Sequence, residues 1–256
     1  MDLQLKGKKA IVLGGSRGIG RAIAETLAEE GADIGLCARD ADQVEAVVAA
    51  LKDKGVKATG ASVDITDSGA LRNWIESAGN EFDGIDILVS NAGAMAQGNA
   101  PEAWEQNFRL DMLGAVHAFA AAKPFLKKAA EAHGDAAFVL ISSVSAAETD
   151  SAGAYGAIKA ALIHYAKGLA RQYAKAGIRT NVVSPGTVYF KGGVWETVEN
   201  NMPDMFKGAI ARNPTGRMAT PQEIATAVVF LASPVSSFTN GVNLLVDGAI
   251  SRRVNF

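Results

Sequence analysis

Short runs of apolar residues alternate along the chain with longer segments in which apolar positions recur every three or four residues. Six of the short runs predict β-strands, at about 10–13, 34–37, 85–89, 136–141, 178–183 and 242–246. Because these runs are apolar on both faces of the strand, they are typical of a parallel sheet covered by helices on both sides.

The segment after the second predicted strand shows helical spacing clearly. Its apolar positions fall on one helix face, namely Val44, Val47, Val48 and Leu51. Asp40 or Asp42 provides an N-terminal cap and Gly55 a stop. Further helices are expected at about 18–30, 67–81, 101–130, 152–175 and 221–232. The alternation predicts an α/β fold: a doubly wound, Rossmann-type parallel sheet with helices on both faces, in a single domain over residues 1–256.

One long stretch, about 187–213, has no clear periodicity. Structureless segments of this length in compact domains usually serve as functional lids. Its large apolar side chains are Tyr189, Phe190, Trp195, Met202, Met205 and Phe206. They predict a lid that faces an apolar or aromatic small-molecule substrate.

Charge and composition narrow the class of ligand. The chain has 25 Lys and Arg against 27 Asp and Glu, for a net charge of −2. Such a balance does not favour nucleic acid or an anionic membrane as a partner. The first residues lack a signal-peptide pattern, and no apolar stretch is long enough to span a bilayer, so we expect a cytoplasmic protein. The single Cys37 is expected to be a buried, unpaired thiol.

A glycine-rich loop directly follows the first predicted strand and opens the first predicted helix. Its residues are Gly14, Gly15, Ser16, Arg17, Gly18, Ile19 and Gly20. Glycines permit close backbone approach, and a helix N-terminus offers unpaired N–H groups to a pyrophosphate. The alternative is an ordinary glycine-rich turn. The spacing is G-x-x-x-G-x-G rather than the commoner G-x-G-x-x-G.

Four later motifs stand in a characteristic order after this loop. They are Ser90-Asn91-Ala92-Gly93, Ile141-Ser142-Ser143, Tyr155-x-x-x-Lys159 and Ser184-Pro185-Gly186. With the glycine loop they resemble the short-chain dehydrogenase/reductase family, in particular its 3-oxoacyl reductase-like members, over nearly the whole chain. The resemblance implies an oxidoreductase that interconverts a ketone and a secondary alcohol with NAD(P). It also implies a homodimer or homotetramer built through the 101–130 and 152–175 helices.

Tyr155 and Lys159 form a chemically sensible pair. They are four residues apart on a predicted helix, so the Lys159 ammonium lies on the same face as the Tyr155 hydroxyl. A nearby positive charge lowers the pKa of a tyrosine and makes it a usable acid and base near neutral pH. The resemblance further implies that Lys159 holds the nicotinamide ribose.

Either Ser142 or Ser143 could supply the hydroxyl that hydrogen-bonds the substrate oxygen. Ser142 stands 13 positions before Tyr155, the family's common interval, and Ser143 stands 12 before it. The local motif favours Ser143, the second serine of the pair, and a loop loses one residue easily. We therefore expect Ser143 to be catalytic.

The chain departs from the family pattern at three positions. Asp111 stands where the family has a fourth catalytic residue, an Asn whose backbone carbonyl holds a relay water. An Asp keeps that carbonyl, so activity is expected to survive with a shifted pH optimum. Leu13 replaces a structural Thr before the glycine loop. Phe190 replaces a Thr that contacts the carboxamide, a contact that the backbone of Val188 could still provide.

NADP(H) is the favoured cofactor, with NAD(H) as the alternative. An NAD enzyme usually carries an acid at the end of the second strand, where this chain has Ala38. Arg17 and Arg39 can pair with a 2′-phosphate, although Asp40 argues against it. The resemblance implies a cofactor site made of Gly14, Ser16, Arg17, Gly18, Ile19, Gly20, Arg39, Asp64, Ile65, Asn91, Ala92, Gly93, Tyr155, Lys159, Pro185, Gly186 and Val188. In this set Asp64 and Ile65 are the adenine contact that follows the third strand.

Two other functions remain open. One is an NAD-dependent secondary-alcohol dehydrogenase, and the other is a catalytically silent nucleotide-binding protein on the same fold. His117, His133 and His164 do not have the spacing of metal ligands, so no metal site is expected.

Overall fold

The computed structural model describes residues 2–148, 152–252 and 254. Within them one parallel sheet has the strand order β3-β2-β1-β4-β5-β6-β7. The strands are β1 (Lys9–Leu13), β2 (Asp33–Ala38), β3 (Ala58–Ser62), β4 (Ile87–Ser90), β5 (Ala136–Ile141), β6 (Ile178–Pro185) and β7 (Asn243–Val246). The order reverses between β1 and β4, so the predicted doubly wound fold is confirmed. Ligands of such sheets bind at the carboxyl ends of the strands, beside this reversal.

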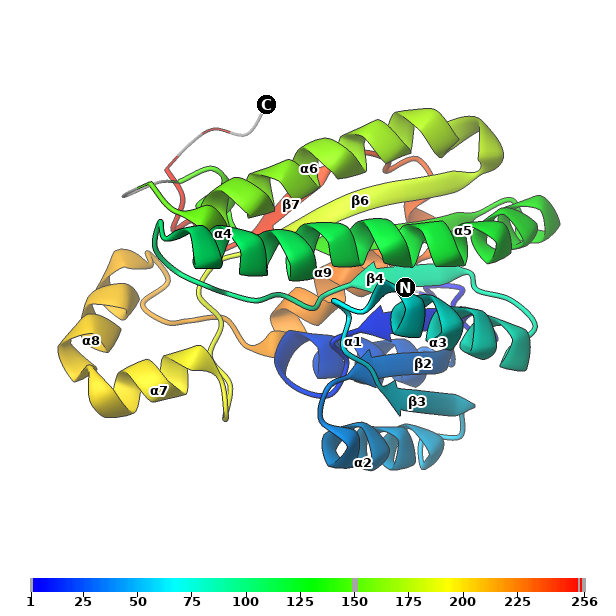
Figure 1. Ribbon diagram of the computed structural model, residues 1–256, viewed down its shortest axis with the longest axis horizontal. Coiled ribbons are helices and arrows are strands. Elements are labelled where there is room, and N and C mark those ends of the chain that lie inside the picture. Colours follow the sequence, from blue (N-terminus) through cyan, green and yellow to red (C-terminus); the bar gives the residue numbers. More distant parts are fainter. Residues whose placement is uncertain (1, 149–151, 253, 255–256) are drawn as a thin grey trace.

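Helices cover both faces of the sheet (Figure 1). They are α1 (Gly18–Glu29), α2 (Ala41–Lys52), α3 (Ser68–Glu81), α4 (Pro101–Asn107), α5 (Gly114–His133), α6 (Ala154–Tyr173), α7 (Val194–Asn201), α8 (Pro203–Arg212) and α9 (Pro221–Ala232). Apolar residues of α1, α2 and α9 form one core layer. Those of α3, α5 and α6 form the other. The sheet is therefore buried on both faces, as its apolar strands predict.

Two features differ from the expected elements. The third strand, β3, has the sequence ATGAS, whose small residues give no apolar run. The expected 101–130 helix is interrupted by a π-helical stretch, Phe108–Leu113, between α4 and α5. Asp40 is the cap of α2, since its side chain accepts a hydrogen bond from the Gln43 backbone.

The prediction that segment 187–213 lacks regular structure is wrong, because it contains α7 and α8. In Figure 1 these two helices, yellow to orange, stand apart from the sheet. Only Val198 of α7 and Ala209 of α8 are buried. The two helices are only 8 and 10 residues long, and Pro203 begins the second, so neither gives a helical pattern long enough to be recognised in the sequence.

No helix among the described residues combines the length and the hydropathy that a membrane span requires. The same residues contain no cluster of three or more His, Cys, Asp or Glu side chains placed to hold a metal ion. Cys37 is buried, and burial raises the pKa of its thiol to about 12.

Candidate active site

The glycine loop lies between the carboxyl end of β1 and the first turn of α1, where close packing excludes larger residues. A Cβ at Gly20 would stand 2.0 Å from the Gly14 carbonyl oxygen, and one at Gly14 would stand 3.0 Å from the Ala92 backbone. The Asn91 side chain donates to the same Gly14 carbonyl at 3.0 Å. The loop is thereby fixed against the Asn91-Ala92-Gly93 segment at the end of β4.

The amino end of α1 suits an anionic ligand. Its N-cap residue, Arg17, is extended and makes no side-chain cap, and the first turn has no acidic residue. The first N–H groups of the helix, near Gly18, Ile19 and Gly20, are therefore left for a pyrophosphate. These residues fit a dinucleotide, which would supply that group.

The start of the lid contacts the glycine loop at two points. The Arg17 guanidinium donates to the Gly192 carbonyl at 3.0 Å. The Phe190 ring lies over Gly18, where a Cβ would stand 2.5 Å from Phe190 Cζ. Gly18 also has a φ of +54°, so this position favours glycine for two reasons. Where the family pattern has a threonine hydroxyl, this chain therefore places the aromatic ring of Phe190 against the glycine loop.

The end of β2 offers positive charge to a ligand. Arg39 is exposed, and its guanidinium donates no hydrogen bond within the described chain. Asp40, the acid that argued against a phosphate here, uses one carboxylate oxygen on the Gln43 backbone and the other on the Gln43 amide, at 3.0 and 2.8 Å. Both oxygens of Asp40 are therefore used in capping the amino end of α2. The Ser16 hydroxyl donates to the Gln43 side chain at 3.3 Å.

Asp64 and Ile65 follow β3 at the same edge of the sheet. Hydrogen bonds from the Thr66 hydroxyl and backbone lower the pKa of Asp64. Ile65 is buried against Gly114, where a Cβ would stand 2.6 Å from the Ile65 side chain. The pair therefore lies at the same carboxyl edge of the sheet as the glycine loop, with β2 between β3 and β1.

The two serines after β5 have different roles. Ser142 is buried and donates to the Lys159 backbone carbonyl at 2.8 Å, so its only O–H donor is used. The Ser143 oxygen accepts from the Ser145 backbone at 3.1 Å and caps the short 3-10 turn Val144–Ala146. Its O–H donates to no group among the described residues, which leaves it available to a ligand.

Tyr155 and Lys159 lie in the first two turns of α6 and face one another. The Lys159 Nζ atom is 5.7 Å from the centre of the Tyr155 ring. The same Nζ donates to the Ile141 carbonyl at 3.0 Å and lies 2.7 Å from Asp111 Oδ1. The predicted i, i+4 pair is therefore brought together, with Ser143 and Asp111 on neighbouring elements.

Pro185 is the last residue of β6, and Gly186 and Val188 follow it in the next turn. The Gly186 backbone donates to Val246 at 3.0 Å, and a Cβ on Gly186 would meet Asp247 Cα at 2.9 Å. Val188 is buried and bridges to Ala219. This turn leads into the lid, where the Tyr189 hydroxyl donates to Glu199 at 2.5 Å. That hydrogen bond, with burial, raises the pKa of Tyr189 to about 12.

One residue of the site escaped the sequence analysis. Asn107 is fully buried, and its amide donates to Ala96 and Ala103 carbonyls, both at 2.8 Å. It also accepts from the Ala96 backbone at 3.3 Å. Asn107 thus holds the loop after Gly93. The sequence signal that could have identified Asn107 is its spacing: it is a polar residue four positions before Asp111 in the expected 101–130 helix.

Comparisons with known proteins agree with this geometry. A family model described as enoyl-(acyl carrier protein) reductase matches residues 14–251. Isoepoxydon dehydrogenase patN of Penicillium expansum is 34% identical over 251 residues, which cover 96% of this chain and 95% of that protein.

Two solved structures show similarity over the full length. L-sorbose reductase from Gluconobacter frateurii, complexed with NADPH and L-sorbose, has a TM-score of 0.89 and 32% identity, with 99% of this chain and 100% of that chain covered. The NADH-dependent reductase A1-R′, responsible for alginate metabolism, has a TM-score of 0.85 and 29% identity, with 98% and 100% covered. Similar folds thus serve either nicotinamide cofactor.

Proposed function

Because this chain belongs to the short-chain dehydrogenase/reductase family, whose members act on CH–OH groups, we propose that it interconverts a ketone and a secondary alcohol with NADP(H). A 3-oxoacyl-type carbonyl is included in this class. The observation that carries the proposal is the Tyr155–Lys159 pair on α6, with the turn that Ser143 caps in contact with the same helix.

In the proposed reaction the bound nicotinamide supplies or accepts the hydride. During reduction the Tyr155 hydroxyl donates its proton to the substrate oxygen, and the Ser143 hydroxyl donates a hydrogen bond to the same oxygen. The Lys159 ammonium stabilises the resulting phenolate by charge. Ser142 holds the α6 backbone at Lys159, so the ammonium stays in place. Oxidation uses the same groups in reverse.

The preference for NADP(H) is supported by the charges at the end of β2. Ala38 places no carboxylate there, Arg39 has unused donors, and Asp40 is committed to Gln43. Arg17, which precedes α1, would have to give up its bond to the Gly192 carbonyl before it could contribute to the same charge. The alternative is NAD(H), as in the NADH-dependent reductase with the same fold.

We also propose that residues 187–213 act as a substrate lid on a single catalytic domain. Val194, Met202 and Met205 are exposed apolar side chains of this segment, which suits a substrate with an apolar or aromatic face. Trp104 and Phe108, exposed at 38% and 46%, lie near the helices through which we propose a homodimer or homotetramer.

The proposal is tested by following NADPH oxidation with a panel of ketones, and NADP⁺ reduction with secondary alcohols. Tyr155→Phe keeps the ring but removes the transferable proton, so kcat should fall by about 10²- to 10⁴-fold. The Kd for NADPH should barely change. Tyr165→Phe, ten positions along the same helix, is the matched control and should leave kcat unchanged.

A parent protein that binds NADPH but reduces no carbonyl would contradict the proposed reaction. It would favour the silent nucleotide-binding alternative. A protein that turns over equally well with Tyr155→Phe would retain the reaction class but reject the assigned acid.

A further inference from the structure

The two carboxylate oxygens of Asp111 contact two different groups. Oδ1 lies 2.7 Å from the Lys159 ammonium, and Oδ2 accepts a hydrogen bond from the Ala94 backbone N–H at 2.8 Å. The Asp111 side chain is 1% exposed and that of Lys159 is 4% exposed. Both contacts are therefore made away from water.

Only a carboxylate satisfies both contacts at this position. Its two oxygens are both acceptors, and the groups that face them, an ammonium and a backbone N–H, are both donors. An asparagine offers one acceptor and one NH₂ group. Whichever way it is turned, either Lys159 or Ala94 would face another donor.

The pair also fits closely against the backbone of the loop. A Cβ at Gly93 would stand 3.0 Å from Asp111 Oδ1 and 3.4 Å from Lys159 Nζ. One turn before Asp111, the Asn107 amide holds Ala96 through its carbonyl and N–H. Between these two anchors Met95 has a φ of +56° and a side chain that is 48% exposed. Asp111 and Asn107 thus hold opposite ends of a short, strained loop.

We propose that Asp111 is a positioning residue that ties the Lys159 ammonium to the 94–96 loop and partly neutralises its charge toward Tyr155. This inference rests on the proposed function. It assigns the carboxylate itself a task, whereas the resemblance to the family concerns only the backbone carbonyl at this position.

The charges around the pair give the direction of the effect. Lys159 faces Asp111 from α6 and also lies 5.7 Å from the centre of the Tyr155 ring. Ser142 and Ser143 present neutral hydroxyls after β5, and the 94–96 loop is uncharged. On the same helix Glu105 and Arg109 pair with each other at the surface. Removing the Asp111 charge therefore leaves the Lys159 ammonium uncompensated, which favours the Tyr155 phenolate.

The test compares the pH dependence of kcat for alcohol oxidation in the parent protein and in Asp111→Asn. The acidic limb of the profile should move to lower pH by about one unit, since an opposite charge at this range shifts a pKa by 1–3 units. The maximal kcat should stay within several-fold, and KM for the carbonyl substrate should rise as the loop loosens. An unmoved limb, or a shift to higher pH, would overturn the proposal.

Three variants separate positioning from general stability. Asp135→Asn makes the same chemical change in the other buried cation–carboxylate pair and should leave the limb in place. Asn107→Ala frees Ala96 but keeps the Asp111 pair, so it should raise KM without moving the limb. Asp111→Glu keeps both acceptors and should retain the parent limb; if Asp111→Asn does not fold, a shifted limb in Asp111→Glu overturns the proposal.

A second readout does not depend on turnover. Tyrosinate absorbance is titrated in the parent protein and in Asp111→Asn, each against its Tyr155→Phe counterpart. Tyr165 and Tyr189, whose pKa values are raised to about 12, contribute little at lower pH. The Tyr155 titration should move down in Asp111→Asn. If no carbonyl is reduced, the proposed function fails while this titration still decides the role of Asp111.

Discussion

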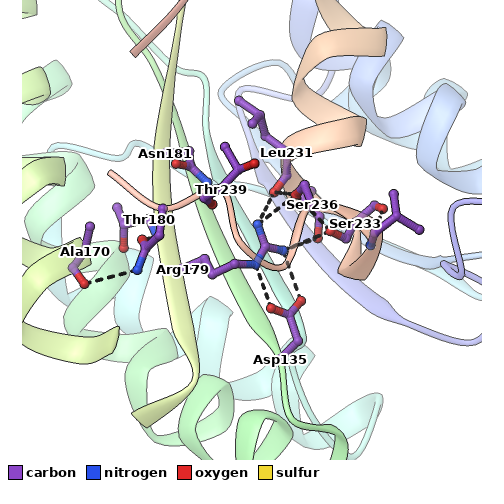
Figure 2. Close-up of polar contacts among 12 residues, drawn as sticks. Asp135, Ala170, Arg179, Thr180, Asn181, Leu231, Ser233, Ser236 and Thr239 are labelled. Carbon is purple, nitrogen blue, oxygen red and sulfur yellow. Dashed lines mark hydrogen bonds and ion pairs between the residues drawn. The ribbon is translucent and has the colours of Figure 1, made fainter. Parts of the chain in front are cut away.

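Two cation–carboxylate pairs with buried cations lie at opposite ends of β5 and β6, and the cations differ in how many of their donors are used. Lys159 lies at the carboxyl ends and pairs with Asp111 at 2.7 Å. Arg179 lies at the amino end of β6 and pairs with Asp135 at 2.6 and 3.0 Å (Figure 2). Both cations are nearly inaccessible, with side chains 4% and 5% exposed.

The Arg179 guanidinium has no donor to spare. Besides Asp135, it donates to the Leu231 carbonyl, the Ser233 carbonyl and the Ser236 hydroxyl, at 2.6, 3.0 and 2.9 Å. Its five N–H groups are then all used. The carbonyls belong to the carboxyl end of α9, where a helix lacks its own donors. Arg179 therefore joins α9 to the sheet and can bind nothing else.

The Lys159 ammonium differs in this respect. Among the described residues it donates one hydrogen bond, to Ile141 O, and forms an ion pair with Asp111 Oδ1, whereas an ammonium has three donors. At least one N–H is therefore left to face a ligand at the edge of the sheet where ligands bind. The comparison teaches that burial and ion pairing do not mark a functional cation; an unused donor does.

Breaking the Arg179 pair should have the largest effect on stability. Arg179→Met leaves Asp135 and the α9 carbonyls without their donor, so the free energy of unfolding should fall by about 3–5 kcal/mol. Urea denaturation followed by circular dichroism measures this. The kcat of the folded fraction should be unchanged, because no Arg179 donor reaches the site.

The control for this prediction is Lys128→Met, which removes the exposed ion pair with Asp83. Both side chains are solvated, so unfolding should change little. An Arg179→Met protein that unfolds like Lys128→Met would show that the buried network contributes no net stability. One that folds normally but loses turnover would reject the division between the two pairs.

The sequence allowed the fold to be predicted and pointed to most residues of the candidate site, for local reasons. The glycine loop adjoins a strand and a helix, and Tyr155 and Lys159 lie on one ordinary α-helix, where a spacing of four fixes their common face. The apolar strands required a sheet covered on both sides. These features depend on short stretches of chain with regular geometry.

The contacts of Asp111 could not be predicted in the same way. The π-helical stretch Phe108–Leu113 changes the number of residues per turn, so positions inferred from an α-helical spacing face the wrong direction. Its partners, Ala94 and Lys159, come from other parts of the chain. The lid helices escaped prediction for another reason: they are short, 8 and 10 residues, and Pro203 divides them, so no long helical pattern marks the segment.

Arg39, like Lys159, has N–H donors that are not used within the protein. It is exposed and donates no hydrogen bond within the described residues. If it binds a 2′-phosphate, Arg39→Ala should weaken NADPH binding by about 1.5–3 kcal/mol, the range for a charge-assisted hydrogen bond. NADH binding should change far less. Fluorescence titration with both cofactors measures the difference.

Arg171→Ala is the matched control, since this exposed arginine lies at the other end of α6, away from the carboxyl edge of the sheet. It should alter neither Kd. Equal losses for NADPH and NADH in Arg39→Ala would reject the preference for NADP(H) and favour the NAD-dependent alternative.

The smallest effect is expected in the lid, which lies outside both buried pairs. Tyr189 and Phe206 form an edge-to-face contact with ring centres 5.9 Å apart, and such pairs contribute about 0.5–1.5 kcal/mol. Phe206→Leu should therefore raise KM for bulky ketones by a factor of a few, with less change for small ketones and none in the Kd for NADPH. Trp195→Leu should act in the same direction.

The control is Phe238→Leu, which changes a fully exposed ring outside the 187–213 segment. An unchanged ranking of ketones in both lid variants would show that the apolar lid does not select the substrate.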